Sequence, residues 1–223
     1  MKFNLRNNPS SKSKENIMSI AIIGAGAIGS AIARNLARNG ISASISNSRG
    51  PESLKTLTDE LGPHIKAVSV KDAAQADIVF VAVPWAHLES ALKDLGPWNG
   101  RVLVDANNAV EVRIEANNVP SFHAVDLGGR ASSEVVAQWA PGAKVVKAFN
   151  HLIAQPLASG PKAEGGRRVL FLAGQDADAK KSVSDLIVRL GFTPIDLGGV
   201  NESRLTQFPG GPLAIINLAH LDQ

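Results

Sequence analysis

Three glycines near the start of the chain have the spacing of a phosphate-binding loop, G-x-G-x-x-G. They follow an apolar segment at residues 20–23, and they are Gly24, Gly26 and Gly29. In a strand–loop–helix unit the first glycine allows a tight turn, the second lets the backbone approach a pyrophosphate, and the third lets the helix pack on its strand. The N–H groups at the start of that helix, at Ala27 and Ile28, would then face the anion. The spacing therefore predicts a dinucleotide site, and a plain tight turn is the weaker alternative.

The end of the next predicted strand, at residues 41–46, indicates which dinucleotide would bind. An NAD site usually has an acidic residue about 20 residues after the glycines, whereas an NADP site needs cations and donors for the 2′-phosphate. No acidic residue lies between Gly24 and Glu52, and the critical residues are Asn47, Ser48 and Arg49. A guanidinium with an amide and a hydroxyl beside it favours NADP(H). The alternative is that these residues form only a polar turn.

The composition of the chain indicates one globular domain. With 223 residues, 44% of them hydrophobic, the chain can bury one substantial core, and no apolar run approaches the length of a membrane span. Cysteine is absent, which excludes disulfides and thiolate chemistry. The net charge of +3 lies entirely in residues 1–17, which we expect to be a disordered basic tail and not a signal peptide. We therefore expect a single domain over residues 18–223, located in the cytoplasm.

The residue types argue against nucleic-acid, membrane and metal-binding functions. Outside the tail the charges balance, and aromatic residues make up only 4% of the chain, so no base-stacking surface is expected. Five histidines are present, but none of them has the spacing of a metal site. Since no membrane segment is predicted either, the expected partner is a small molecule.

Apolar runs and helical patterns alternate along the rest of the chain. Further strands are predicted at residues 66–70, 77–83, 101–105, 144–148, 169–173 and 193–196. Helices are predicted from the glycine loop to Asn39 and at residues 51–61, 72–76, 85–95, 133–139, 176–190 and 213–220, with a looser region before residue 133. This order predicts an α/β fold: a doubly wound, Rossmann-like NADP-binding domain with a mostly parallel sheet and a small helical extension at the C-terminus.

In a doubly wound sheet, ligands bind beyond the carboxyl ends of the strands, so residues that follow those ends are candidates. Asn107 is one, because a neutral amide can serve the ribose or the amide of the nicotinamide half. Trp85, Asn150 and His151 are candidates for the wall of an acceptor pocket. The alternatives are that Trp85 is an ordinary core residue and that His151 lies at the surface or caps a helix. No residue is predicted as a certain catalytic group.

Several of these segments together resemble the NADPH-dependent reductases of the deazaflavin coenzyme F420 and the related cytosolic domain of the six-transmembrane metalloreductases. The matching segments are the glycine loop, Asn-Ser-Arg-Gly-Pro at 47–51, Val-Ala-Val-Pro-Trp at 81–85, Asp-Ala-Asn-Asn at 105–108 and Val-Lys-Ala-Phe-Asn at 146–150. The resemblance implies that a nicotinamide ring lies near Val83, Pro84 and Ala148, with an isoalloxazine-like ring stacked against it. It also implies a homodimer, which no other feature of the sequence indicates.

The resemblance implies an oxidoreductase that transfers hydride between NADP(H) and coenzyme F420 or a flavin-like acceptor such as FMN or FAD. Hydride transfer between two rings depends on their distance and orientation and requires no protein nucleophile. Dehydrogenases and imine reductases that add a large helical C-terminal domain to the same nucleotide fold fit less well, because the sequence ends at residue 223. A non-catalytic NADP(H)-binding redox sensor is the alternative. The acceptor, the direction of reaction and the oligomeric state stay open.

Overall fold

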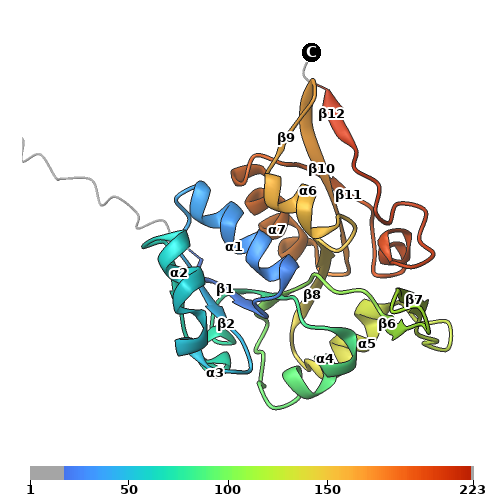
Figure 1. The fold of residues 1–223 in the computed structure, drawn as a ribbon, viewed down its shortest axis with the longest axis horizontal. Helices are drawn as coiled ribbons and strands as arrows, with labels where there is room; N and C mark the ends of the chain where they lie inside the picture. The colour runs from blue at the N-terminus through green and yellow to red at the C-terminus, as the bar shows by residue number, and fades with distance from the viewer. Residues whose placement is uncertain (1–17, 222–223) are drawn as a thin grey trace, which may run out of the picture.

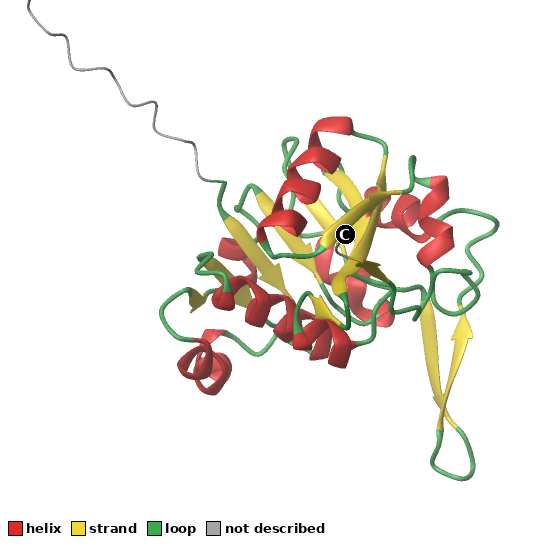
Figure 2. Cartoon of the chain, turned by 90° about the horizontal axis from the view of Figure 1, so that it is seen from above, coloured by secondary structure: helices red, strands yellow, loops and turns green. Residues whose placement is uncertain are grey.

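The computed structural model describes residues 18–221 and shows a central sheet with helices on both faces, as Figure 1 and Figure 2 show. The predicted basic tail at residues 1–17 lies outside the described residues. The strands follow one another across the sheet in the order β11-β10-β8-β5-β4-β1-β2-β3. Their bounds are β1 (Ile20–Ile23), β2 (Ala43–Ser46), β3 (Ile65–Ala67), β4 (Ile78–Val81), β5 (Val102–Asp105), β8 (Lys144–Ala148), β10 (Gly166–Gly174) and β11 (Thr193–Asp196).

The strand directions confirm the predicted doubly wound, mostly parallel sheet. From β3 to β8 every neighbouring pair is parallel, and β11 is parallel to β10. The pair of β10 with β8 is antiparallel. The chain builds outward from β1 to β3 and then crosses back to β4 on the other side of β1. Such a reversal opens a crevice at the carboxyl ends of β1 and β4, where ligands of this fold class bind.

Two apolar clusters cover the two faces of the sheet, because successive side chains of a strand point to opposite faces. Ile20 and Ile22 of β1 belong to one cluster, whereas Ala21 and Ile23 belong to the other. The helices on the first side are α1 (Ala27–Arg38), η1 (Pro51–Leu54), α2 (Lys55–Leu61), α6 (Ala154–Ser159) and α7 (Ala177–Arg189). Those on the second side are α3 (Val70–Ala73), α4 (Trp85–Leu92) and α5 (Ser132–Trp139). Both faces of the sheet are therefore buried.

A two-stranded hairpin occupies part of the region that was expected to be loose. It consists of β6 (Val110–Ile114) and β7 (Pro120–Ala124), and Figure 2 shows it projecting from the rest of the domain. Its register places Val112 opposite Phe122, and both of these side chains are exposed. The base of the hairpin is held by an edge contact between the rings of Phe122 and Phe208, whose centroids are 5.6 Å apart. The hairpin follows the carboxyl end of β5 after the predicted segment 105–108, and none of its residues lines the cavity described below.

The C-terminal extension differs from the prediction, and the helix expected at residues 213–220 is wrong. The segment contains the 3-10 helix η2 (Asn201–Thr206), a series of turns and β12 (Ala219–Leu221), which pairs with β10 as β9 (Lys162–Ala163) also does. The N–H of Leu213 donates to Leu205 O over 2.8 Å, and the N–H of Ile215 donates to His151 O over 2.7 Å. Ile215 also has a φ of +57°, and residues 219–221 pair with β10, so the backbone cannot continue here as a right-handed helix.

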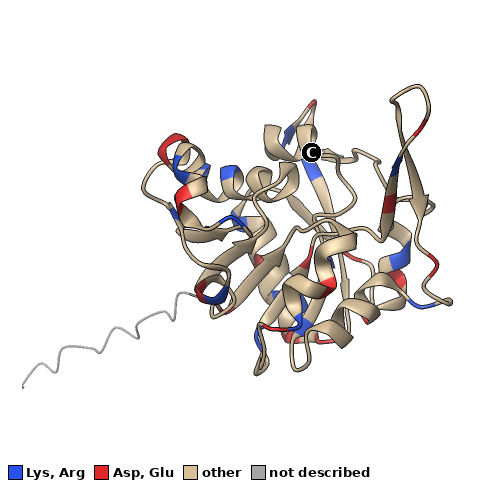
Figure 3. Ribbon diagram, turned by 60° about the horizontal axis from the view of Figure 1, so that its bottom comes forward, with Lys and Arg blue, Asp and Glu red and all other residues tan. Residues whose placement is uncertain are grey.

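Cationic and anionic side chains are interspersed over the surface, as Figure 3 shows. Some form pairs one helical turn apart, such as Lys55 with Asp59 at 2.7 Å and Lys181 with Asp185 at 2.6 Å. Exposed pairs of this kind stabilise a fold by less than about 1 kcal/mol each. Within residues 18–221, none of the helices has both the length and the apolar character that crossing a membrane would require.

Candidate functional site

The three motif glycines have different surroundings: backbone atoms crowd two of them, whereas the third borders open space. A Cβ on Gly24 would lie 2.1 Å from the carbonyl oxygen of Ala82, and one on Gly29 would lie 1.8 Å from the carbonyl oxygen of Gly24. Packing alone therefore requires glycine at both positions. A Cβ on Gly26 would meet nothing within 4 Å. The open space at Gly26 fits the close approach of a pyrophosphate, which is the role that the motif gives to its second glycine.

A cavity of about 730 Å³ opens in front of Gly26, at the carboxyl ends of β1, β2 and β4. The first turn of α1 contains no acidic residue, and its N-cap, Gly26, makes no side-chain hydrogen bond to the helix. The first N–H groups of this 12-residue helix, including those of Ala27 and Ile28, thus retain free donor capacity beside the cavity. A cavity of this size with a helix N-terminus at its edge can hold the phosphates of a dinucleotide.

The turn after β2 lines the same cavity and presents its three predicted residues in different ways. Asn47 forms the turn itself: its Oδ1 accepts the Arg49 N–H over 2.9 Å, and its Nδ2 donates to Ser53 Oγ over 2.9 Å. Ser48 and Arg49 are exposed and line the cavity. Among the described residues no carboxylate pairs with the Arg49 guanidinium. The polar turn and the predicted binding residues are therefore one and the same segment.

Lys71 lines the cavity, as does His87 at the end of the candidate segment 83–87, but Lys71 is not among the site residues that the sequence predicts. The rule that ligands lie beyond strand ends was applied to the strands before Gly24, Asn47 and Val83, but not to the strand that precedes Lys71. That strand, β3, ends at Ala67, earlier than the predicted residue 70. The Oγ of Ser69 accepts the N–H of Asp72 over 3.1 Å and so starts α3 at Val70 rather than at residue 72. Applying the rule to β3 would have identified Lys71.

A buried polar network lies at the carboxyl ends of β5 and β8. Lys147 is 1% exposed and Asp105 is 0% exposed, and the Lys147 Nζ donates to Asp105 Oδ2 over 3.1 Å and to Ser132 Oγ over 3.0 Å. Nζ also donates to the carbonyl oxygen of Asn107, and Asp105 Oδ2 accepts from Ser133 Oγ over 2.8 Å. Burial lowers the pKa of Lys147, whereas the adjacent Asp105 carboxylate opposes the change. The network is a paired charge with its hydrogen bonds satisfied.

Asn107 connects this network to the loop after β4. Its Nδ2 donates to Asp105 Oδ1 over 2.9 Å, and its Oδ1 accepts the backbone N–H of Val83 over 2.8 Å. The side chain is therefore engaged within the protein, and Asn107 acts on the cavity by holding Val83 in place. Val83 and the adjacent Pro84 do line the cavity, while Ala148 lies buried in the core.

Asn150 joins three segments that are distant in the sequence. Its Nδ2 donates to Asn108 Oδ1 over 3.0 Å and to the carbonyl oxygen of Thr206 over 2.9 Å. Its own Oδ1 is buried and has no hydrogen-bond partner among the described residues. The preceding residue, Phe149, has a φ of +65° and places its ring edge-on to Phe80, with centroids 5.2 Å apart. The free oxygen of Asn150 can accept a hydrogen bond from a ligand, so its role stays a prediction.

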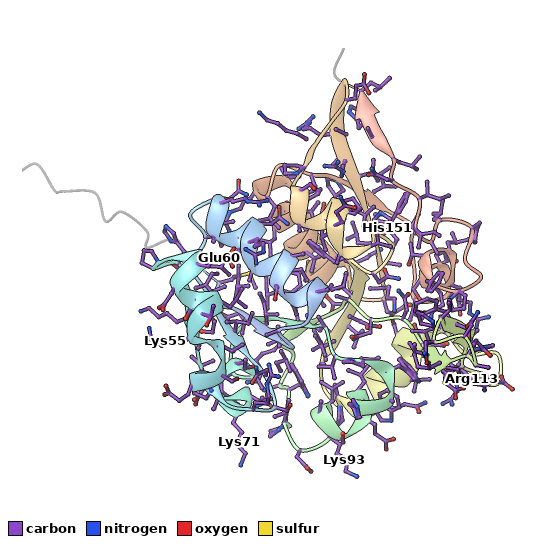
Figure 4. The ribbon with its side chains drawn as sticks, viewed as in Figure 1. Lys55, Glu60, Lys71, Lys93, Arg113 and His151 are labelled. Carbon is purple, nitrogen blue, oxygen red and sulfur yellow. The ribbon has the colours of Figure 1, made fainter. Side chains whose placement is uncertain are left out.

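None of the three acceptor-pocket candidates, Trp85, Asn150 and His151, lines the cavity. The ring of Trp85 packs on Trp139 with centroids 5.1 Å apart. His151 is 1% exposed and lies on Phe171 with ring centroids 4.9 Å apart, so it is neither a surface residue nor a helix cap. Burial lowers its pKa to about 4; a backbone group of Val169 partly opposes this, although neither ring nitrogen has a hydrogen bond of normal geometry. Figure 4 shows His151 well away from Lys71.

Comparison with known proteins identifies the family. A family model described as "NADP oxidoreductase coenzyme F420-dependent" matches residues 19–109, which include the glycine loop and Arg49. A structure described as an F420-dependent NADP reductase from an Arthrobacter species is 30% identical with a TM-score of 0.70, and the match covers 84% of this chain and 87% of that chain. The chain belongs to this family. Membership makes it an NADP-dependent oxidoreductase, and the free cations at the cavity agree with that cofactor.

Two further proteins are similar to this chain. A hypothetical protein from Sinorhizobium meliloti is 46% identical with a TM-score of 0.82, and the match covers 91% of this chain and 96% of that chain. The rat metalloreductase STEAP3 is 30% identical over 83% of this chain. The chain spans 35% of that metalloreductase, so the likeness concerns about a third of the larger protein.

Proposed function

We propose that this oxidoreductase exchanges a hydride between NADP(H) and a flavin-like acceptor, coenzyme F420 or a free flavin. The observation that carries the cofactor part of the proposal is an open Gly26 on the wall of the same cavity as an Arg49 guanidinium that has no ion-pair partner within residues 18–221. Family membership supports the acceptor part. The open glycine fits a pyrophosphate, and the guanidinium with Ser48 fits the additional phosphate of NADP. When bound, the cofactor supplies a hydride from its reduced nicotinamide, and the acceptor takes up that hydrogen with both electrons.

The residues of the chain contribute binding and orientation to this reaction. Gly26 and the start of α1 hold the phosphates, and the turn after β2 holds the adenosine end. Val83 is fixed by its hydrogen bond to Asn107, so the loop beside the predicted nicotinamide position is rigid. Two rings that are held close and oriented react without a protein nucleophile.

Stopped-flow mixing tests the proposal. The protein is mixed with NADPH and, in separate experiments, with F420, FMN, FAD or a ferric chelate, and the absorbance of the reduced nicotinamide is followed. We expect F420 or a flavin to accelerate NADPH oxidation, and NADH to react far more slowly. Tight NADPH binding without turnover of any acceptor would contradict the proposal and favour a redox sensor.

A Gly26→Ala variant tests the predicted pyrophosphate site separately from the stability of the fold. The added methyl group meets no atom within 4 Å in the free protein, and Gly26 has a φ of −75° that alanine adopts readily, so the variant should fold normally. The same methyl group lies where the pyrophosphate must approach. We expect the variant to unfold at the same urea concentration as the wild type while losing acceptor-dependent NADPH oxidation.

A further inference from the structure

Lys71 lines the same cavity as Arg49 but lies on a different element. It belongs to α3, which packs on β1 and β2 and so brings Lys71 beside the turn that follows β2. The side chain is exposed, and in the described part of the chain no carboxylate forms an ion pair with it. Figure 4 shows Lys71 on the edge of the molecule formed by α3 and α4.

The neighbouring carboxylates leave Lys71 available. Asp72, the next residue, accepts a hydrogen bond from Ser69 Oγ over 2.6 Å and is thus engaged at the start of α3. Asp94, which follows α4, contributes the one carboxylate among the residues that line the cavity, and among the described residues it forms no ion pair with Lys71. An exposed lysine that faces a cavity with no partner of its own is suited to a ligand that carries negative charge.

We propose that Lys71 is a second cation for the 2′-phosphate of NADP and helps to determine the choice between NADPH and NADH. This rests on the proposed function, because it assumes that NADP(H) occupies the cavity. A phosphate monoester carries a charge of about −1.5 to −2 near pH 7, and the single guanidinium of Arg49 balances only part of it. Arg49 can bind two phosphate oxygens as a planar fork, whereas Lys71 acts as a flexible point charge from the other side.

The test measures equilibrium binding of NADPH and NADH to wild-type protein and to Lys71→Met, which keeps the alkyl chain and removes the charge. Removing one exposed charged contact should weaken NADPH binding by roughly five- to tenfold and leave NADH binding within about twofold. Lys93→Met is the matched control, since Lys93 is exposed at the end of α4 but does not line the cavity. Lys71→Arg should retain the preference for NADPH.

Two further readouts distinguish a phosphate contact from a structural role. With one cation fewer, NADPH binding by Lys71→Met should depend less steeply on salt concentration than binding by the wild type. The strengthening of NADPH binding as the 2′-phosphate loses its second proton near pH 6 should also be smaller in the variant. Unchanged NADPH binding by Lys71→Met, or equal losses for NADPH and NADH, would overturn the inference.

The outcomes also separate this inference from the proposed function. If Arg49→Ala weakens NADPH selectively but Lys71→Met does not, the inference about Lys71 fails and the cofactor assignment stands. If wild-type protein binds NADPH no better than NADH, the proposed cofactor preference fails, and the role of Lys71 fails with it.

Discussion

The two ends of the predicted cofactor path are built in opposite ways. At the open end, Arg49 and Lys71 are exposed cations that have no ion-pair partner within residues 18–221 and that line a cavity. At the closed end, Asp105, Asn107 and Lys147 are buried and hydrogen-bonded to one another. The open end can lose a charge without harm to the fold, whereas the closed end cannot. Recognition of the ligand and rigidity of the site are thus assigned to different residues.

Removing a charge from the closed end should have the largest effect on the stability of the protein. Lys147→Met removes the cation beside the buried Asp105 carboxylate and should lower the free energy of unfolding by about 3 to 5 kcal/mol. Urea denaturation measures this directly. Lys144→Met, on the same strand, is the control: its ion pair with Asp176 at 3.0 Å is partly exposed, so its removal should cost less than about 1 kcal/mol. If the free energy of unfolding fell by similar amounts in the two variants, water would have to reach the pair of Lys147 and Asp105.

The pH dependence of protein stability reports how completely His151 is shielded from water. Its pKa of about 4 in the folded protein lies below the ordinary value of 6.5, so the unfolded chain binds the proton more readily. Stability should therefore be complete above pH 6.5 and fall as the pH drops toward 4, by about 3 kcal/mol in total. His151→Phe should reduce this fall, as measured by urea denaturation across that range. Ile187→Val, a buried change without a titratable group, should lower stability equally at each pH.

At the open end, Arg49→Ala should change recognition but not stability. Losing a charged hydrogen bond to the 2′-phosphate should weaken NADPH binding by about 1.5 to 3 kcal/mol, with NADH binding nearly unchanged. Fluorescence titration with both cofactors measures the difference, and Arg113→Ala, on the hairpin, is the control. The assignment of Arg49 to the 2′-phosphate would be contradicted by equal losses for both cofactors.

Asn107 connects the open and closed ends, so its replacement should affect both the stability of the protein and the binding of the cofactor. Asn107→Ala leaves the Val83 N–H without its acceptor and should reduce stability by about 1 to 2 kcal/mol. Because Val83 lies beside the cavity, NADPH and NADH should both bind less tightly and by similar factors. Asn117→Ala, in the exposed hairpin turn, is the control and should change neither the stability of the protein nor its affinity for either cofactor. A selective loss of NADPH would show that Asn107 contacts the adenosine end of the cofactor instead.

Local patterns predicted the elements that depend on one continuous segment. The glycine spacing and the apolar run before it predicted β1 and α1, and the apolar stripe of residues 176–190 predicted α7. The alternating sequence Val-Glu-Val-Arg-Ile at residues 110–114 forms β6, although the sequence analysis predicts only a looser region there. The helix predicted at residues 213–220 is wrong because Ile215 has a positive φ and residues 219–221 pair with the distant strand β10. Helical propensity cannot anticipate such long-range partners.

The residues of the predicted site also fall into those that local spacing predicts and those that depend on distant segments. The turn at residues 47–49 and the open Gly26 could be identified from spacing, because their roles follow from the geometry of one β-α-β unit. The engagement of Asn107 with Val83, the unpartnered oxygen of Asn150 and the burial of His151 could not, since each depends on segments that meet only in the folded chain.

The sequence by itself determined the fold class, the position of the dinucleotide loop and the lack of an acidic residue after the second strand. These are properties of residue type and local spacing. Only the tertiary structure decided which polar side chains are free to meet a ligand and which are engaged in holding the site together. The physical reason is that a side chain's hydrogen-bond partners and its exposure to water are set by the neighbours that packing brings to it, and for Lys71 and Lys147 those neighbours come from different strands and helices.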